Sequence, residues 1–193
     1  MEIVVTNRQN MIKLSYVINN PCALISIIGT YDSRPKFKHN SNIKAILELC
    51  FDDVEEDCNN ELAMKYKDAI AVADFVNSLK DIDILYVHCE AGISRSAGVA
   101  AAISKALTGD DAYFFERPFC PNMNCYKLTL KAFGLDITPT ELYELDNKIN
   151  DNIKKELEEW YNSDNIKFDI DRLYRIYSWI YGDYDNYNSE KFK

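Results

Sequence analysis

The stretch "ILYVHCEAGISRSAGVAAAI" (residues 84–103) decides the fold. Its first six residues, which end in His88 and Cys89, are almost continuously apolar. They predict a strand buried on both faces, as in a parallel sheet. The segment "SAGVAAAISKAL", which begins at Ser96, is rich in alanine and spaced aliphatic residues and predicts a buried helix, in which Gly98 permits close packing. A strand, a short loop and a helix in this order predict an α/β fold.

Apolar runs elsewhere predict further strands of the same sheet. Residues 22–30 and 44–51 are rich in aliphatic side chains and bounded by polar segments, and "EIVV" at 2–5 is a shorter run of the same kind. Between residues 60 and 80 apolar residues recur at spacings of three and four, which predicts an amphipathic helix. A turn and a short helix are expected at 108–116. Strands that alternate with helices predict parallel pairing with right-handed connections.

The second half of the chain predicts helices. One helix is expected to begin near residue 122 and to end at Gly134, and spaced apolar residues predict another at 142–166. An aromatic segment from residue 168 predicts a further helix, followed by a frayed tail. We therefore expect a central, mostly parallel sheet flanked by helices in a domain at 1–134, with a helical C-terminal extension at 135–193 that packs on it.

The composition excludes several classes of partner. The chain has 193 residues and a formal net charge of -9, which repels nucleic acid and anionic membranes, so no nucleic-acid partner is expected. It has no apolar run long enough to span a bilayer, so no membrane partner is expected either. The beginning of the sequence lacks a basic leader followed by an apolar stretch and a cleavage site, so we expect a cytoplasmic location.

Cysteine and histidine usage points away from disulfides and metals. The chain has six cysteines, and a core of this size does not need disulfides for stability, so we expect reduced thiols. No C-x-x-C is present, and neither His39 nor His88 stands at zinc-ligand spacing from cysteines, so no metal is expected. The loop at 30–42 holds a cluster of basic residues, which is either a solvated surface or a basic lip beside an anionic site.

The loop that follows the strand at 84–89 has the features of an anion site. A strand that enters a loop and then a helix directs backbone N–H groups and the positive helix end at one point, and Gly92 lets these groups converge. Cys89 lies beneath that point, where the helix end favours its thiolate. Arg95 can match two phosphate oxygens, and Ser96 can donate its hydroxyl to the sulfur. The residues expected to hold phosphate are Glu90, Ala91, Gly92, Ile93, Ser94 and Arg95.

A thiolate that attacks phosphorus also needs an acid to protonate the leaving oxygen. The segment "FDDVEED" after the strand at 44–51 supplies Asp52 and Asp53. Loops at the carboxyl ends of neighbouring parallel strands meet over one crevice, so an aspartate after one strand can face Cys89 after the next. A cysteine nucleophile, an arginine and an acid together predict phosphate ester hydrolysis.

These residues resemble a known family. "HCEAGISRS" matches the H-C-x-x-G-x-x-R-[ST] signature of the cysteine-based protein tyrosine phosphatase superfamily and is most similar to its compact, dual-specificity phosphatase-like members. "LELCFDD" is similar to the strand that leads to the family's general acid, and "RPFCPN" with "YKLTLKAF" is similar to its Arg-Pro, Pro-Asn segment and the helix behind it. The resemblance covers about residues 20–134 and implies a protein tyrosine phosphatase-like fold.

The resemblance implies a protein phosphatase that acts on phosphotyrosine, and on phosphoserine or phosphothreonine, in phosphorylated proteins or peptides. Cys89 would attack phosphorus while Arg95 and the loop amides hold the developing charge. Asp53 aligns with the family's acid, and Asp52 is the alternative. His88 would keep the loop in shape. The reaction needs no cofactor and no metal.

Other functions remain open at this point. An enzyme with the basic loop beside its site would act on an RNA 5' end or a small phosphometabolite. A non-catalytic phosphate-binding module would use Arg95 and the loop alone. A thiol redox enzyme would need a resolving cysteine, for which Cys50 is the candidate. Glu90 and Ile93 stand where lipid-directed family members tend to have lysine, which disfavours an inositol phospholipid.

Overall fold

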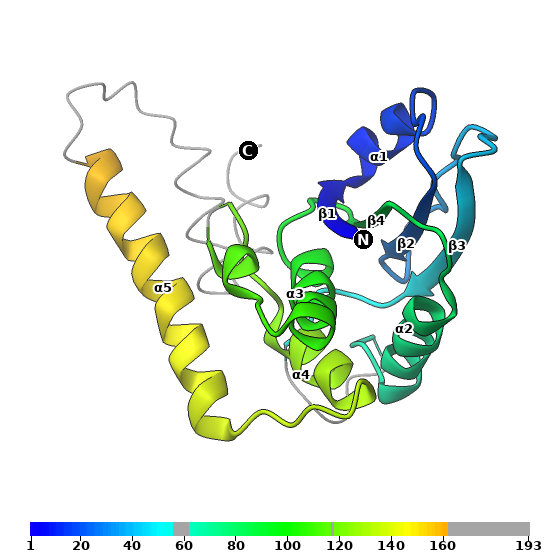
Figure 1. Cartoon of the computed structure of the whole chain (residues 1–193). Coiled ribbons are helices and arrows are strands. Elements are labelled where there is room, and N and C mark those ends of the chain that lie inside the picture. The colour runs from blue at the N-terminus through cyan, green and yellow to red at the C-terminus, as the bar shows by residue number, and fades with distance from the viewer. Residues whose placement is uncertain (56–61, 117, 162–193) are drawn as a thin grey trace. The chain divides into compact units, whose positions relative to one another are not determined.

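The computed structural model of the chain describes residues 1–55, 62–116 and 118–161, with side chains up to residue 155. The chain divides into two compact units, Met1–Ile153 and Lys154–Lys193. The sheet and the site described below belong to the first unit (Figure 1). The helix predicted from residue 168 and the predicted tail lie outside the described residues. No helix within the described part of the chain is both long and apolar enough to cross a bilayer.

The described strands form one parallel sheet, in the order β1-β4-β2-β3. They are β1 (Glu2–Asn7), β2 (Cys22–Ile28), β3 (Ile43–Cys50) and β4 (Ile84–Cys89). The four predicted strands are therefore confirmed, and so is the α/β class. Because every pair is parallel, the carboxyl ends of all strands meet at one edge of the sheet. Strand β2 is buried over almost its full length and lies between β3 and β4, so those two strands are not neighbours.

The helices surround this sheet. They are α1 (Arg8–Leu14), α2 (Tyr66–Ser78), α3 (Arg95–Thr108), the 3-10 helix η1 (Ala112–Phe115), α4 (Met123–Ala132) and α5 (Pro139–Tyr161). Helix α3 packs on β1 and β4, and α4 packs against both α2 and α3. Figure 1 shows α2, α3 and α4 grouped together and α1 apart from them. The helix predicted within 108–116 is the 3-10 turn η1, and the helix predicted from about 122 is α4.

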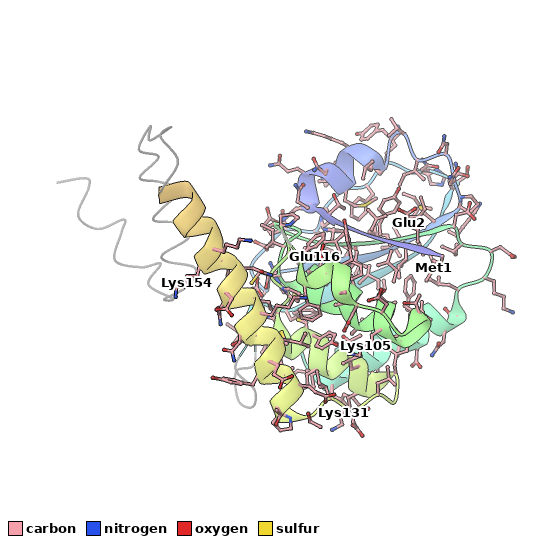
Figure 2. All side chains as sticks on the ribbon, turned by 60° about the vertical axis from the view of Figure 1, so that its left-hand side comes forward. Met1, Glu2, Lys105, Glu116, Lys131 and Lys154 are labelled. Carbon is pink, nitrogen blue, oxygen red and sulfur yellow. The ribbon has the colours of Figure 1, made fainter. Side chains whose placement is uncertain are left out.

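The core lies where α3 meets the sheet and α4. Helix α3 is buried without interruption from Arg95 to Ile103. A Cβ atom on Gly98 would lie 2.5 Å from the carbonyl oxygen of Asn122, so the close packing predicted for this glycine is confirmed. Toward its C-terminal end the helix reaches the surface, where Lys105 (Figure 2) pairs with Asp111 at 3.3 Å. The segment that follows β4 is thus joined to the most extensively buried of the described helices.

Two helix starts differ from the prediction. Helix α2 begins at Tyr66, and residues 62–65 are not helical, because the backbone N–H of Lys65 donates to the Asp68 carboxylate at 2.9 Å and fixes the first turn there. Helix α5 begins at Pro139, before the predicted residue 142. Thr138 and Glu141 exchange hydrogen bonds across its first turn in a capping box.

Helix α1 was not predicted. It has one buried side chain, Met11, and its start is fixed by Asn7, whose side chain accepts the backbone N–H of Asn10 at 2.8 Å. A helix of only seven residues presents too little apolar periodicity to be recognised from the sequence. It matters because its first residue, Arg8, lies at the carboxyl end of the sheet.

Candidate active site

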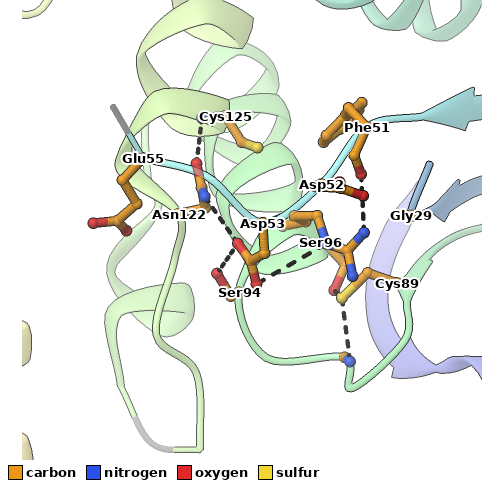
Figure 3. Close-up of polar contacts among 12 residues, drawn as sticks. Gly29, Phe51, Asp52, Asp53, Glu55, Cys89, Ser94, Ser96, Asn122 and Cys125 are labelled. Atoms are coloured by element: carbon orange, nitrogen blue, oxygen red, sulfur yellow. Dashed lines mark hydrogen bonds and ion pairs between the residues drawn. The ribbon is translucent and has the colours of Figure 1, made fainter. Parts of the chain in front are cut away.

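Cys89 is the last residue of β4 and Arg95 is the first residue of α3, so the loop between them (residues 89–95, the cysteine loop) joins a buried strand to a buried helix. The Sγ atom of Cys89 accepts the backbone N–H of Gly92 at 3.3 Å and lies 3.1 Å from the Oγ atom of Ser96 (Figure 3). Cys89 and Ser96 are both buried. The loop therefore holds a sulfur atom at the positive end of α3.

The curl of the loop depends on Gly92. Its φ angle is +71°, in the left-handed region that favours glycine. A Cβ atom here would lie 2.5 Å from the carbonyl carbon of Thr6 and 2.6 Å from the nitrogen of Asn7, both in the backbone of β1. The backbone N–H of Arg8 also donates to the carbonyl of Glu90 at 3.3 Å. The cysteine loop is thus pressed against the end of β1, with no room for a side chain at this position.

Arg95 lies beneath the loop with unused hydrogen-bonding capacity. Its side chain is 9% exposed, and its Nη1 atom donates to the carbonyl of Phe51 at 3.0 Å. Its Nε atom is buried and has no hydrogen-bond partner. The nearest opposite charge is the Oδ2 atom of Asp53, at 4.0 Å. A buried guanidinium N–H without a partner is costly, so the site favours an anion that would accept from it.

The two candidate acids face different ways. The Oδ1 atom of Asp53 accepts hydrogen bonds from the Ser94 hydroxyl at 2.7 Å and from the Asn122 side-chain amide at 2.8 Å (Figure 3). Asp52 instead accepts the backbone N–H of Thr30 at 2.7 Å, in the segment that follows β2. Asp53 is therefore the aspartate that contacts the cysteine loop.

The aspartate and the cysteine come from strands that are not adjacent. The sequence predicted neighbouring strands, whereas β2 separates β3 from β4. The carboxylate reaches the cysteine loop because the chain continues past the end of β3 and crosses the end of β2. The backbone N–H of Phe51 donates to the carbonyl of Ile28 at 3.0 Å along this path.

His88 lies behind the cysteine loop, fully buried. Its Nδ1 atom is 3.3 Å from the carbonyl oxygen of Cys89, and its Nε2 atom is 2.8 Å from the hydroxyl of Ser26 on β2. Because a carbonyl can only accept, Nδ1 carries the proton, and the serine hydroxyl donates to Nε2. Burial lowers the pKa of His88, and the hydrogen bond to Cys89 opposes this only in part. A neutral imidazole thus connects β4 to β2.

The remaining residues of the cysteine loop make backbone hydrogen bonds or surface ion pairs. Ala91 and Ile93 are exposed, and the carbonyl of Ile93 accepts the backbone N–H of Cys120 at 3.0 Å. The exposed side chain of Glu90 forms an ion pair with Arg8 at 3.2 Å. The guanidinium of Arg8 also donates to the Ser33 hydroxyl at 3.1 Å, which ties the loop after β2 to the cysteine loop.

Two residues of this site were not predicted from the sequence. Asn122 was quoted only as part of a family segment, although an asparagine after proline and before a helix is an N-cap signal. Its Oδ1 atom accepts the backbone N–H of Cys125 at 2.9 Å and caps α4. Arg8 carried no signal, because only the parallel pairing of β1 with β4 brings it to the site.

Burial acts on two other described thiols. Burial raises the pKa of Cys125 far above its usual range, and burial with nearby acidic groups raises that of Cys120. Cys50 ends β3, two strand spacings from β4, which corresponds to about 9–10 Å. A disulfide requires Cα atoms within about 7 Å, so Cys50 does not reach Cys89 without backbone movement. Among the residues described, no group of three or more metal-ligating side chains is present.

Comparisons with known proteins give structural neighbours only. No protein-family model and no curated protein sequence matches the chain. Among solved structures the chain is similar to human DUSP28, with a TM-score of 0.39 and 13% identity, over 80% of this chain and 94% of that one. It is also similar to the Yvh1 phosphatase domain from Chaetomium thermophilum, with a TM-score of 0.35 and 15% identity, over 75% and 87%. A mouse structure described as a putative dual specificity phosphatase is similar too, with a TM-score of 0.40 and 13% identity, over 80% of this chain and 86% of that one. The α/β class rests on the chain's own sheet and helices.

Proposed function

We propose that the chain is a phosphoric monoester hydrolase of the cysteine-based protein tyrosine phosphatase superfamily, acting on phosphotyrosine and on phosphoserine or phosphothreonine in proteins or peptides. The observation that carries the proposal is the buried, unpartnered Nε atom of Arg95. It lies under a loop that also holds a cysteine sulfur at the N-terminus of α3. A phosphate dianion supplies the acceptors that this arrangement lacks.

In the first step the thiolate of Cys89 attacks phosphorus. A bond from sulfur to phosphorus forms while the bond from phosphorus to the ester oxygen breaks, and the electron pair of that bond goes to the oxygen. Asp53 gives its proton to this oxygen, and the product alcohol or phenol leaves. Arg95 and the loop N–H groups hold the charge that develops on the phosphoryl oxygens.

In the second step water attacks the phosphorus of the cysteinyl phosphate. Asp53, now a carboxylate, takes a proton from the water, and the bond from sulfur to phosphorus breaks. The hydroxyl of Ser96, 3.1 Å from Sγ, donates a hydrogen bond to the departing sulfur. Inorganic phosphate is released, and the thiolate is restored without any cofactor.

The contacts of the sulfur favour turnover over simple binding. A phosphate-binding module would need Arg95 and the loop, but it would not need a sulfur held by Gly92 and Ser96 or a carboxylate across from it. The charges also favour a protein substrate over RNA. Arg34 of the basic loop is paired with Glu48 at 2.7 Å, which neutralises part of that surface. A net charge of -9 opposes long polyanions further.

Hydrolysis of p-nitrophenyl phosphate by the purified chain tests the proposal. We expect turnover in the wild type and in Cys50→Ser, which changes an exposed thiol. Cys89→Ser should abolish turnover while keeping affinity for phosphate. Turnover that survives in Cys89→Ser would refute the mechanism, and phosphate binding by a wild type without turnover would indicate a binding module.

A Cys89→Ser variant then serves to identify substrates. Incubation with phosphotyrosine, phosphoserine and phosphothreonine peptides should retain the peptides that the wild type hydrolyses. Affinity for a true peptide substrate should change little with ionic strength, whereas a steep decrease in affinity with added salt would favour a polyanion such as RNA.

A further inference from the structure

Two hydrogen-bond donors converge on a single oxygen of Asp53. The hydroxyl of Ser94 lies 2.7 Å from Oδ1, and the side-chain Nδ2 of Asn122 lies 2.8 Å from the same atom. The other oxygen, Oδ2, accepts from neither and faces the Nε atom of Arg95 at 4.0 Å. The two oxygens of this carboxylate therefore have different environments.

The two donors are themselves rigidly joined. The backbone N–H of Asn122 donates to the carbonyl of Ser94 at 3.2 Å. Asn122 is fully buried, and its other side-chain atom, Oδ1, is used to cap α4. Ser94 precedes α3, yet its hydroxyl makes no capping bond and is directed to Asp53. Both side chains are thus committed to the carboxylate by the packing of α3 against α4.

An oxygen that accepts two hydrogen bonds has its lone pairs engaged, so the proton of a carboxylic acid belongs on the other oxygen. We infer that Ser94 and Asn122 form a clamp that places the catalytic proton on Oδ2 of Asp53, the oxygen that faces the anion site. This inference rests on the proposed function, in which Asp53 is the acid. Ser94 and Asn122 are positioning residues, because they act through Asp53.

Two variants remove the donors separately. Ser94→Ala removes the hydroxyl and leaves the backbone of the cysteine loop intact. Asn122→Asp keeps an acceptor for the N–H of Cys125 but replaces the donated N–H with a second carboxylate against Asp53. Ser104→Ala is the matched control, since it removes a serine hydroxyl of α3 that donates to the carbonyl of Asp110 and not to Asp53.

The measurement is kcat/KM for p-nitrophenyl phosphate and for phenyl phosphate, whose leaving group needs protonation far more. Each clamp variant should lose about tenfold to a hundredfold with phenyl phosphate, and much less with p-nitrophenyl phosphate, because general acid catalysis contributes about 10²–10⁴ in rate. In an Asp53→Asn background neither substitution should add a further loss with phenyl phosphate. Ser104→Ala should leave the ratio of the two substrates unchanged.

The outcomes distinguish a failure of the clamp from a failure of the proposed function. Equal losses on both substrates, or losses that add to that of Asp53→Asn, would overturn the clamp while turnover through Cys89 still stands. If Asn122→Asp does not fold, Ser94→Ala alone decides by the same ratio. Turnover that persists in Cys89→Ser would overturn the proposed function itself. The ratio of the two substrates in the clamp variants tests the clamp and not that function.

Discussion

At the scale of single residues, the shape of Arg95 matters as much as its charge. The guanidinium uses Nη1 to hold the carbonyl of Phe51 and keeps Nε buried and unpartnered. Arg95→Lys retains the charge but has no planar fork, so it cannot both anchor and bind two phosphate oxygens. We expect kcat/KM for p-nitrophenyl phosphate to fall by about a hundredfold or more. Arg34→Lys, an exposed ion-paired arginine, is the control and should keep its activity.

The neighbouring aspartates should differ in effect. Asp53→Asn removes the proposed acid and should lower kcat for phenyl phosphate by about 10²–10⁴. Asp52→Asn keeps one oxygen that can accept the backbone N–H of Thr30. Its effect on the rate should therefore be small and equal for good and poor leaving groups. Steady-state rates on both substrates check this. A selective loss in Asp52→Asn would transfer the acid role to Asp52.

His88 should make the stability of the fold depend on pH. Burial lowers its pKa in the folded state below the ordinary value of 6.5, so the unfolded chain binds more protons in the interval between the two values. The free energy of unfolding should therefore fall as the pH is lowered through 6.5, by at most about 1.4 kcal/mol per pH unit.

Urea unfolding at pH values on both sides of 6.5 tests this. His88→Asn should flatten the pH dependence in that interval, although the variant loses overall stability. His39→Asn replaces an exposed histidine and should leave the dependence as it is in the wild type. An unchanged slope in His88→Asn would show that other groups cause the effect.

At the scale of secondary structure elements, the contact between β1 and the cysteine loop is the critical one. Gly92→Ala would place a methyl group 2.5 Å from the backbone of Thr6, in addition to the cost of a left-handed alanine of about 1–2 kcal/mol. Gly109, also left-handed, has no atom within 4 Å of the corresponding position. We expect Gly92→Ala to lose most activity, and Gly109→Ala to lose only stability, of about 1–2 kcal/mol. Rates and urea unfolding of both variants check this.

The elements also show which parts of the fold the sequence could predict. Strand β2 and helix α3 were predictable because their burial is nearly continuous and leaves a clear apolar pattern. Helix α2 began too early in the prediction because Ala63 and Met64 are buried in non-helical backbone, which apolar spacing alone does not distinguish from a helix. The order of strands was not predictable, since it depends on contacts between residues far apart in sequence.

The same division applies to the site. Cys89, Arg95 and Ser96 lie within eight consecutive residues, so their juxtaposition follows from one loop, and the sequence pattern contains it. Which of Asp52 and Asp53 contacts the cysteine loop depends on the path of the chain beyond β3. Asn122 reaches Asp53 across the junction of α3 and α4, a contact that no local pattern encodes.

At the scale of the whole molecule, helix α5 contributes to the core that carries the site. Ile149 is 4% exposed and belongs to the hydrophobic core, whereas Tyr143 on the same helix is 67% exposed. Ile149→Ala should lower the free energy of unfolding by about 2–5 kcal/mol. Tyr143→Ala should change it by about 0.5 kcal/mol or less.

Urea unfolding and p-nitrophenyl phosphate turnover measure both effects. We expect kcat to stay near the wild-type value in the folded fraction of both variants, since α5 is not part of the junction of β4 and α3 that forms the cysteine loop. A large loss of kcat in a fully folded Ile149→Ala variant would mean that α5 shapes the site rather than only supporting it.

Strand β2 separates the strand that leads to the proposed nucleophile from the strand that leads to the proposed acid. The cysteine loop follows β4 and the acid-bearing segment follows β3, so the two segments are not held together by direct pairing of their strands. Their relative position depends instead on side-chain contacts, those of Arg95 with the carbonyl of Phe51 and of Ser94 with the carboxylate of Asp53. Loss of these contacts would therefore separate the proposed acid from the proposed nucleophile without altering the sheet.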